Sequence, residues 1–354
     1  MSTAQQRRFI SRLRMVAQRL VGEPWPSVTQ AAYDMMCLQG QDWPGVQLSL
    51  ALRTRARSLS EVREAFNSGR LVRTWPQRGT LHVLSAADVA WYLPLTAQRK
   101  LAGEEARRQR WGVSAADIDA VRDVTVRALR TMSPRMTREE LEALWVEDRL
   151  LHDRNHRYYF LHHLCVEGTL VLGPMDESGV HLFVLAEDWI RESRRLDRDD
   201  AVVELVSRYL RSHGPASRRD LNWWSGLPLR EIDAAIEECA AHLTSFQVDG
   251  QRFWVDNAVL ERAESTAVAR SVLALPGFDE LILGYASRYM TVPERFDGIL
   301  VPGNHGVFRS SIISGGTAVG YWRRSAKRLR AEFFAAATPS LERRVEHALA
   351  RLPR

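Results

Sequence analysis

Apolar side chains recur with helical spacing along the N-terminal part of the chain. Ile10, Leu13 and Val16 share one face of a helix predicted over residues 7–22. Further helices are predicted over residues 28–37, with Ser27 as the N-cap, and over residues 46–55 and 60–69. Two strand-like runs follow, residues 71–75 and 79–84, around Pro76-Gln77-Arg78. Helices followed by a two-stranded hairpin are the pattern of a winged-helix module.

The same order of elements returns twice. The second copy is predicted from a helix over 115–132, a helix opened by the capping box Thr137-Arg138-Glu139-Glu140, a helix over 157–167, and strands 168–173 and 180–184. The third is predicted from helices 201–211, 217–224 and 229–241 and from strands 244–248 and 253–255. Asp249-Gly250 between these strands is a strong hairpin signal. The length of the repeat indicates duplicated modules rather than a solenoid.

The C-terminal part has a different sequence pattern, with short apolar runs separated by glycines and turn residues. Runs at 271–275, 299–301, 307–313 and 317–322 predict a small β-rich domain, and a final helix is predicted from about Leu329. Arg343 and Arg344 beside Leu341 and Val345 suit a helix packed on the body of the protein. The predicted fold is α+β and mainly α, with modules at residues 1–110, 111–195, 196–268 and 269–354.

Composition narrows the class of protein. Hydrophobic residues at 45% and charged residues at 26% are ordinary for a folded soluble chain. No apolar run approaches the roughly 18 residues of a membrane span, and the N-terminus lacks a signal-peptide pattern, so we expect a cytoplasmic protein without membrane contact. The three cysteines are far apart, which leaves no framework for disulfides or a thiolate cluster. We therefore expect chemistry without metal or cofactor.

Positive charge is concentrated at both ends of the chain. Residues 1–110 carry 17 Arg or Lys against 8 Asp or Glu, and residues 322–354 carry 9 against 3, which leaves the middle acidic. Such a distribution favours contact of the N-terminal module with a polyanion, although solvated arginine-rich helix faces explain it as well. Only Lys100 and Lys327 are lysine, so few amines are present for Schiff-base chemistry.

Two glutamines flank one small residue in Leu38-Gln39-Gly40-Gln41-Asp42. A glutamine amide does not titrate, so such a pair positions groups rather than transferring protons. Three stretches occur in this order along the chain. The first is this motif with Arg73 to His82, the second is His213 to Leu227, and the third is Phe278-Asp279-Glu280 with Gly284-Tyr285 and residues 320–324. Together they resemble the winged-helix DNA glycosylases of the AlkZ/YcaQ type.

The resemblance implies three tandem winged helix-turn-helix modules in a C-shape around duplex DNA, followed by the β-rich domain. It also implies excision of alkylated purines, which in some members includes bulky natural-product adducts and interstrand crosslinks. The catalytic element of the AlkZ-like branch is Gln-x-Gln, which Gln39 and Gln41 match. Gly40 stands where the family carries a larger apolar residue.

An alkylated cationic purine leaves deoxyribose without protonation by the enzyme, so the remaining tasks are to hold water and to stabilise oxocarbenium-like charge. Gln39 and Gln41 are predicted to hold the water, and Asp42 to supply negative charge. The alternative is that the glutamines cap the preceding helix and that Asp42 caps the next one.

Basic side chains give the candidates for DNA contact. Arg73, Arg78 and His82 in the first wing suit phosphates or the minor groove, with a solvated hairpin as the alternative. Arg53, Arg55 and Arg57 lie at alternate positions, which spreads them around a helix, so DNA contact and a solvated face both stay open there.

Histidines and aromatic residues elsewhere suggest structure rather than chemistry. His152, His156, His162 and His163 lack convergent carboxylates or thiolates, so packing or solvent exposure is expected instead of a metal site. The remaining expectations are one core residue among Trp223 and Trp224, a capping or network role for Asp220, and a buried hydrogen-bonding pair of Asp279 and Tyr285.

The predicted function is therefore a monofunctional DNA glycosylase that hydrolyses the N-glycosidic bond of N7- or N3-alkylated purines. We expect a monomer whose partner is duplex DNA. The competing class is a non-enzymatic winged-helix DNA-binding protein, such as a transcription regulator. Regulators generally combine one DNA-binding module with a dimerisation or ligand-binding domain, so three modules in one chain favour the enzyme.

Overall fold

A computed structural model describes residues 2–97, 101, 103–151, 153–304, 306–325 and 328–353. The chain divides into two units: unit 1 comprises Met1–Val62 and Val202–Arg354, and unit 2 comprises Arg63–Ala201. It passes between them within the helices α4 (Leu59–Asn67) and α12 (Arg198–His213). The four modules divide the chain more finely, and their boundaries stay a prediction. Among the described residues, none of the helices has both the length and the apolar character needed to cross a membrane.

Unit 1 begins with helices. These are α1 (Thr3–Ala17), α2 (Val28–Met35) and α3 (Trp43–Leu52), with the short strand β1 (Cys37–Gln39) between the last two. Ser27 caps α2 by accepting the N–H of Gln30 at 3.1 Å, as the sequence predicts. Met36 has a φ of 61°, which ends α2 sooner than predicted. Gln39 is therefore the last residue of β1 instead of lying at the end of α2, and Gln41 directly precedes Asp42, the N-cap of α3.

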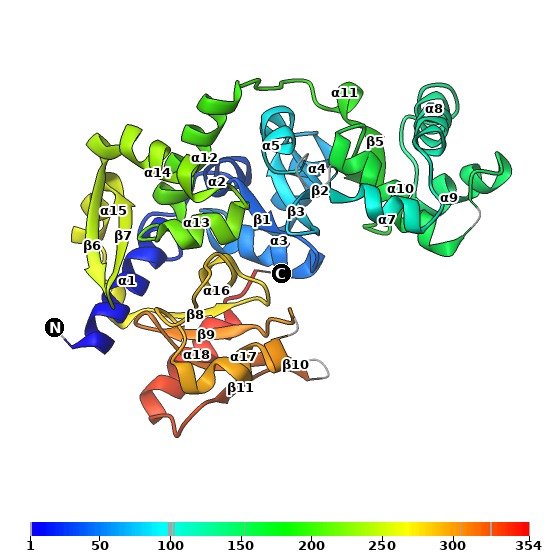
Figure 1. Cartoon of the computed structure of the whole chain (residues 1–354). Helices are drawn as coiled ribbons and strands as arrows, with labels where there is room; N and C mark the ends of the chain where they lie inside the picture. The colour runs from blue at the N-terminus through cyan, green and yellow to red at the C-terminus, as the bar shows by residue number, and fades with distance from the viewer. Residues whose placement is uncertain are drawn as a thin grey trace. The chain divides into compact units, whose positions relative to one another are not determined.

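The second part of unit 1 contains a regular hairpin. After α12 come α13 (Arg218–Ser225) and α14 (Leu229–Glu238), then the paired strands β6 (Leu243–Val248) and β7 (Gln251–Asp256). Asp249 and Gly250 connect the strands with φ values of 51° and 72°, which confirms the predicted hairpin. The helix α15 (Asn257–Glu264), which the sequence analysis missed, packs against α1 beside this hairpin (Figure 1).

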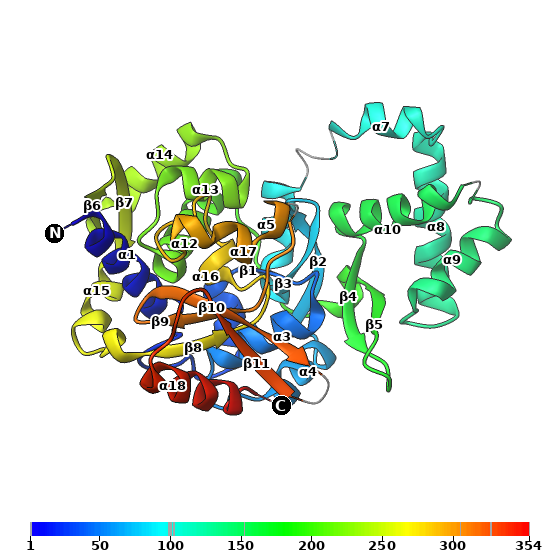
Figure 2. The same cartoon turned by 90° about the horizontal axis from the view of Figure 1, so that it is seen from below.

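A four-stranded antiparallel sheet forms the C-terminal part of unit 1. Its order is β11 (Arg328–Phe333), β10 (Thr317–Ser325), β9 (Ser311–Ser314) and β8 (Val272–Leu275), and α18 (Pro339–Ala350) packs along it (Figure 2). The short helices α16 (Glu280–Leu283) and α17 (Asp297–Leu300) lie between β8 and β9 in sequence. The β-rich character is confirmed, and Val345 and Leu349 are buried against the sheet.

Two predictions in this region were wrong. The apolar run 299–301 lies at the end of α17 rather than in a strand. The helix predicted from Leu329 is strand β11, because Leu329, Ala331 and Phe333 alternate with charged residues and pack against the apolar cluster of the sheet. Pairing with β10 satisfies the backbone of this segment, and the final helix starts only after Thr338.

Unit 2 is built on four strands in the order β3 (Thr80–Ser85), β2 (Leu71–Gln77), β4 (Leu170–Met175) and β5 (His181–Leu185). The two hairpins predicted as separate wings join into one sheet where Arg73 pairs with Leu172. The register of each hairpin shifts across a proline, at Pro76 and at Pro174, because proline has no N–H to donate to the ladder.

Helices enclose the apolar core of unit 2. They are α5 (Val89–Thr96), α7 (Glu105–Arg110), α8 (Ala115–Thr131), α9 (Arg138–Glu147), α10 (Arg154–Glu167) and α11 (Ala186–Trp189). Thr137 and Glu140 form the predicted capping box at the start of α9. Trp145, Phe160 and Leu164 are fully buried at the centre of this core.

Candidate functional site

The Gln39–Gln41 loop leaves β1 and leads into α3. Gln39 is buried, and its side-chain Oε1 accepts the backbone N–H of Gln41 at 3.2 Å. Gln41 itself is exposed. The first glutamine therefore holds the loop in shape, while the second is accessible to a large substrate. The C-cap position of α2 is occupied by Met36, and β1 follows before Gln41.

Asp42 occupies the N-cap position of α3 but makes no capping hydrogen bond through its side chain. Its carboxylate lies over Gly45, where a Cβ atom would come within 2.5 Å of Oδ2. Glycine at position 45 thus leaves room for this carboxylate next to the loop. The alternative role of Asp42 as a side-chain cap is not realised.

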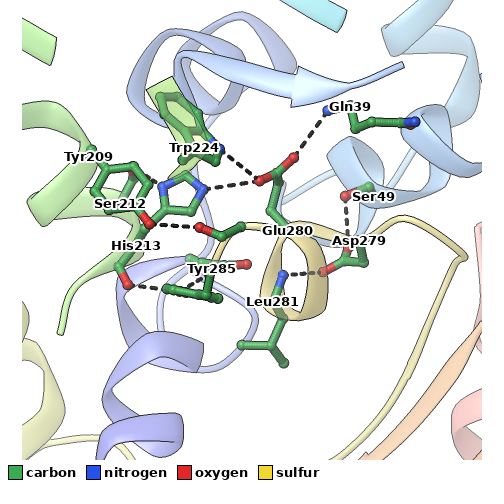
Figure 3. A network of polar contacts seen from close by, with 12 residues as sticks. Gln39, Ser49, Tyr209, Ser212, His213, Trp224, Asp279, Glu280, Leu281 and Tyr285 are labelled. Atoms are coloured by element: carbon green, nitrogen blue, oxygen red, sulfur yellow. Dashed lines mark hydrogen bonds and ion pairs between the residues drawn. The ribbon is translucent and has the colours of Figure 1, made fainter. Parts of the chain in front are cut away.

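Glu280 lies directly beneath the glutamine loop. Its Oε1 accepts the backbone N–H of Gln39 at 3.1 Å, and its Oε2 accepts the indole N–H of Trp224 at 3.2 Å (Figure 3). The side chain is 1% exposed. Because both oxygens accept N–H groups, Glu280 acts as a carboxylate that fixes the end of β1. A Cβ atom at Gly284 would lie 3.1 Å from Oε2, so glycine gives this side chain its space.

His213 faces the same carboxylate, with Nε2 at 3.5 Å from Oε2 of Glu280. Burial lowers the pKa of His213, even though the neighbouring carboxylate acts in the opposite direction. The imidazole is therefore neutral at pH 7. Tyr209 stacks on it with ring centroids 4.6 Å apart and an interplanar angle of 2°. Tyr209 also donates to the carbonyl of Gly284 at 2.6 Å, which holds the ring in place.

Asp279 belongs to a second buried cluster beside Glu280. Arg53 donates Nη1 and Nη2 to its two oxygens, each at 2.8 Å, and Ser49 donates Oγ at 2.7 Å. Arg53 and Asp279 are 0% and 1% exposed. Phe278, the preceding residue, has a φ of 60°, a strained conformation.

The cluster continues toward α1. Arg53 also donates Nη2 to Oε1 of Gln18, and Gln18 donates to the hydroxyl of Tyr285 at 3.0 Å. Tyr285 in turn donates to the carbonyl of His213 at 2.7 Å, and burial raises its pKa. Asp279 and Tyr285 are both buried, as expected, but they are linked through Arg53 and Gln18 rather than paired with each other.

The structure corrects two of the DNA-binding predictions. Arg53 is buried in its bonds to Asp279, so it serves the cluster rather than a phosphate. His82 in unit 2 is also fully buried, with Nε2 at 3.1 Å from Nη2 of Arg78 and Nδ1 at 2.8 Å from the carbonyl oxygen of Thr80. Its contact orients Arg78 instead of reaching the surface.

The other three basic candidates have accessible surface. The side chain of Arg55 is 68% exposed and lies 3.6 Å from Glu23. Arg73 on β2 and Arg78 in the turn of the first wing are partly buried. Arg78 has a φ of 52°, which places its side chain at the tip of the hairpin together with Gly79. These three positions stay predictions for DNA contact.

The histidines of α10 have structural partners. His156 bonds to the carbonyl of Trp111 at 3.0 Å, and His163 lies 3.5 Å from Glu167. The searched, described residues contain no group of three or more His, Cys, Asp or Glu arranged to hold a metal ion. His152, Lys100 and Lys327 lie outside the described residues.

Sequence reasoning missed the residues beneath the loop. Glu280 and His213 occur in stretches that carry the family resemblance, but no local pattern shows that Glu280 meets Gln39 or that His213 meets Glu280. Arg14 was also missed: it is buried, stacks 3.5 Å over the ring of Tyr285 and lies 3.5 Å from Asp220. Asp220 forms the capping box of α13 with Ser217, as expected for a capping or network residue.

Of the tryptophan pair on α13, Trp224 is 0% exposed and Trp223 is 38% exposed. The expectation that one of them belongs to the core is therefore confirmed. Trp224 contributes to the site as well, because its indole N–H fixes Glu280.

Comparisons with known proteins agree with this arrangement. The sequence profile of the family described as "DNA glycosylase AlkZ-like" matches residues 32–354. The chain is 24% identical over 321 residues to a Streptomyces sahachiroi protein named "Interstrand DNA cross-link repair glycosylase", covering 87% of this chain and 85% of that protein. The solved structure of Streptomyces sahachiroi DNA glycosylase AlkZ matches with a TM-score of 0.80 and 23% identity, over 98% of each chain.

Proposed function

The chain belongs to the DNA glycosylase AlkZ-like family, and from this premise we propose that it excises alkylated purines from duplex DNA with Gln39 and Gln41 as its catalytic residues. The observation that carries the proposal is the geometry of the loop. Glu280 holds the backbone at Gln39, the Gln39 side chain holds the backbone at Gln41, and the Gln41 side chain is exposed. A loop held in this way orients amide groups before the substrate binds, which lowers the cost of reaching the transition state.

The proposed reaction is hydrolysis without a metal. The amide oxygen of Gln41 and the second lone pair of Gln39 Oε1, which already accepts the Gln41 N–H, accept hydrogen bonds from a water molecule next to C1′ of the damaged nucleotide. As the bond between C1′ and the purine nitrogen breaks, its electron pair neutralises the cationic base, and the water oxygen then bonds to C1′ and releases a proton. Asp42 stabilises the positive charge that develops on the sugar.

Bulky lesions, including interstrand crosslinks, are part of the proposed substrate range. A crosslinked base cannot turn freely into a closed pocket, so an exposed catalytic side chain such as Gln41 suits it better than a buried one. The name of the Streptomyces relative supports this choice, since that protein is named for crosslink repair.

DNA is proposed to bind through phosphates, with Arg55, Arg73 and Arg78 as contacts. The proposed arrangement comprises three winged-helix modules and places the enzyme in the cytoplasm as a monomer. Removal of the charge of Arg78 should weaken DNA binding by a similar factor for all DNA sequences. It should also reduce the salt dependence of that binding.

The test uses duplex DNA that carries one N7-methylguanine, and a second duplex with a nitrogen-mustard crosslink. Released base and alkali-labile abasic sites are measured beside an undamaged duplex, and borohydride is added in a parallel reaction to trap any Schiff base. We expect base release without strand cleavage and without a trapped complex. Failure to release a base from either lesion would contradict the proposed substrate class.

A further inference from the structure

A cavity of about 540 Å³ lies in unit 1 beside α18, bordered by β8 and by the segment that follows α3. Figure 2 shows α18 running along the sheet next to β8. A cavity of this size falls within the range that commonly holds a small organic ligand. It involves none of the residues of the Gln39–Gln41 loop or of the network beneath it.

Helical spacing explains why cations gather there. Val345 and Leu349 of α18 face the sheet, which turns a neighbouring face of the helix toward the cavity. Arg343, His347 and Arg351 follow one another at intervals of one turn on that face. The other basic residues that line the cavity are Arg57, Arg270 and Arg344.

The positive charge of this cavity is not balanced by acidic residues in its lining. The lining residues, all of which lie in the described part of the chain, include neither Asp nor Glu. Burial lowers the pKa of Arg57, and the charge of Arg351 lowers it further, so these guanidinium groups repel one another. Arg57 nevertheless lies close, because its Nη2 donates to the carbonyl of Arg351 at 3.2 Å. The backbone of Arg57 has a φ of 52°, in the left-handed region.

The rest of the lining is mainly apolar. The half-buried Leu273 and Leu352 form a leucine wall next to the arginines, whereas Leu20, Leu52 and Leu275 of the lining are buried. The backbone of duplex DNA binds along an open surface, where a leucine-lined hollow adds nothing to binding. A nucleotide suits the cavity better, because its flat base can cover the leucines while its phosphates meet the arginines. Arginine pairs with phosphate oxygens through two parallel N–H bonds, which suits a cluster of this kind.

We propose that this cavity is a binding site for a small phosphate-bearing ligand of nucleotide size. Arg343 and Arg351 hold the phosphates, and the leucine wall holds the base. The site is separate from the glutamine loop, and the proposal does not depend on base excision.

The test titrates the full-length protein with ATP and, separately, with inorganic pyrophosphate, by calorimetry near physiological ionic strength. We expect both to bind, and ATP to bind more tightly because only ATP has a base to cover the leucine wall. The double variant Arg343→Gln/Arg351→Gln should bind ATP at least about tenfold more weakly. Both side chains are exposed, so we expect the double variant to keep the wild-type melting temperature. Measuring this temperature shows that the variant folds.

The matched control is Arg191→Gln/Arg195→Gln, which removes two exposed positive charges outside the cavity. This control should bind ATP as the wild type does. Equal weakening in both variants would overturn the proposal, because it would show general charge attraction. The proposal would also be overturned by no binding of ATP to the wild type, by ATP binding no better than pyrophosphate, or by a cavity variant that loses affinity for undamaged duplex DNA but not for ATP.

Discussion

Two clusters of charged side chains in unit 1 differ in how their charges are balanced. Beneath the glutamine loop, the guanidinium of Arg53 meets both oxygens of Asp279, and Ser49 donates to the same carboxylate. In the cavity beside α18, basic side chains gather without any carboxylate among the described lining residues. The first cluster is buried, whereas Arg343 and Arg351 in the second are exposed.

The difference follows from the cost of taking charge out of water. A fully buried ion must have a partner, because its desolvation costs several kcal/mol. An exposed ion keeps much of its hydration, so it can stay without an opposite charge beside it until a ligand arrives. The buried cluster therefore serves the fold beside the Gln39–Gln41 loop, and the exposed one is suited to binding an anion.

The largest expected effect comes from breaking the buried pair. Arg53→Met leaves the carboxylate of Asp279 without its cation, so we expect the free energy of unfolding to fall by about 3 to 5 kcal/mol. Urea or thermal unfolding of the variant measures this. Arg55→Met is the matched control two residues away, and its exposed side chain should change stability by less than about 0.5 kcal/mol. Equal losses of stability in the two variants would show that the buried Arg53–Asp279 pair stabilises the fold no more than an exposed arginine does.

Unit 2 contains a third arrangement, a buried histidine kept neutral. Burial, followed by the nearby charge of Arg73, lowers the pKa of His181 to about 4. An unfolded histidine takes up its proton near pH 6.5, so between these two values the unfolded state binds more protons. Stability should thus fall as the pH falls from about 6.5 to about 4, by on the order of 3 kcal/mol in total.

Unfolding measured at about pH 7 and about pH 4.5 tests this prediction. His181→Asn should reduce the loss of stability at the lower pH, because asparagine does not titrate. His242→Asn, at an exposed histidine, should leave the pH dependence unchanged. The prediction is wrong if His181→Asn and the wild type lose the same stability on acidification.

The next effect concerns positioning of the loop by Glu280. Glu280→Ala removes the acceptor for the Gln39 N–H, and we expect the single-turnover excision rate to fall by about 10- to 100-fold. Glu280→Gln keeps one acceptor oxygen for the Gln39 N–H, while its amide NH2 faces the indole N–H of Trp224, so it should restore part of the rate. A merely structural role would lower stability without this rescue of the rate. If Glu280→Gln loses as much activity as Glu280→Ala, an acceptor for the Gln39 N–H does not by itself position the loop.

The smallest expected effect is in the cavity. Without ligand, Arg343→Gln/Arg351→Gln should leave stability unchanged or raise it by less than about 1 kcal/mol, because it relieves repulsion between exposed cations. Thermal unfolding in a buffer free of phosphate measures this. A clear loss of stability would mean that these arginines are paired in the way that Arg53 is, and the contrast between the two clusters would disappear.

Local signals explain what the sequence could predict. The N-cap at Ser27, the capping box at Thr137 and the Asp249-Gly250 turn each depend on residues within four positions of one another, and all three are present. The strand β11 was mistaken for part of a helix because its character depends on pairing with β10, which the periodicity of a short segment does not reveal.

The candidate site was predictable only in part for the same reason. Gln39, Gln41 and Asp42 form a contiguous motif, whereas Glu280 bonds to Gln39 across 241 residues and to Trp224 across 56. Arg53 was placed among the surface cations because its partner Asp279 is 226 residues away. Charge alone cannot distinguish a buried ion pair from a DNA contact until the fold brings the partner into place.

The most direct test of the account is the single-turnover rate of N7-methylguanine release by Gln39→Ala/Gln41→Ala. It is measured at saturating enzyme beside the wild type and beside Gln247→Ala, a control at an exposed glutamine. The account predicts a loss of about a thousandfold in the double variant with DNA affinity retained, and a wild-type rate in the control. Excision by the double variant at the wild-type rate would contradict the assignment of the glutamine loop as the catalytic site.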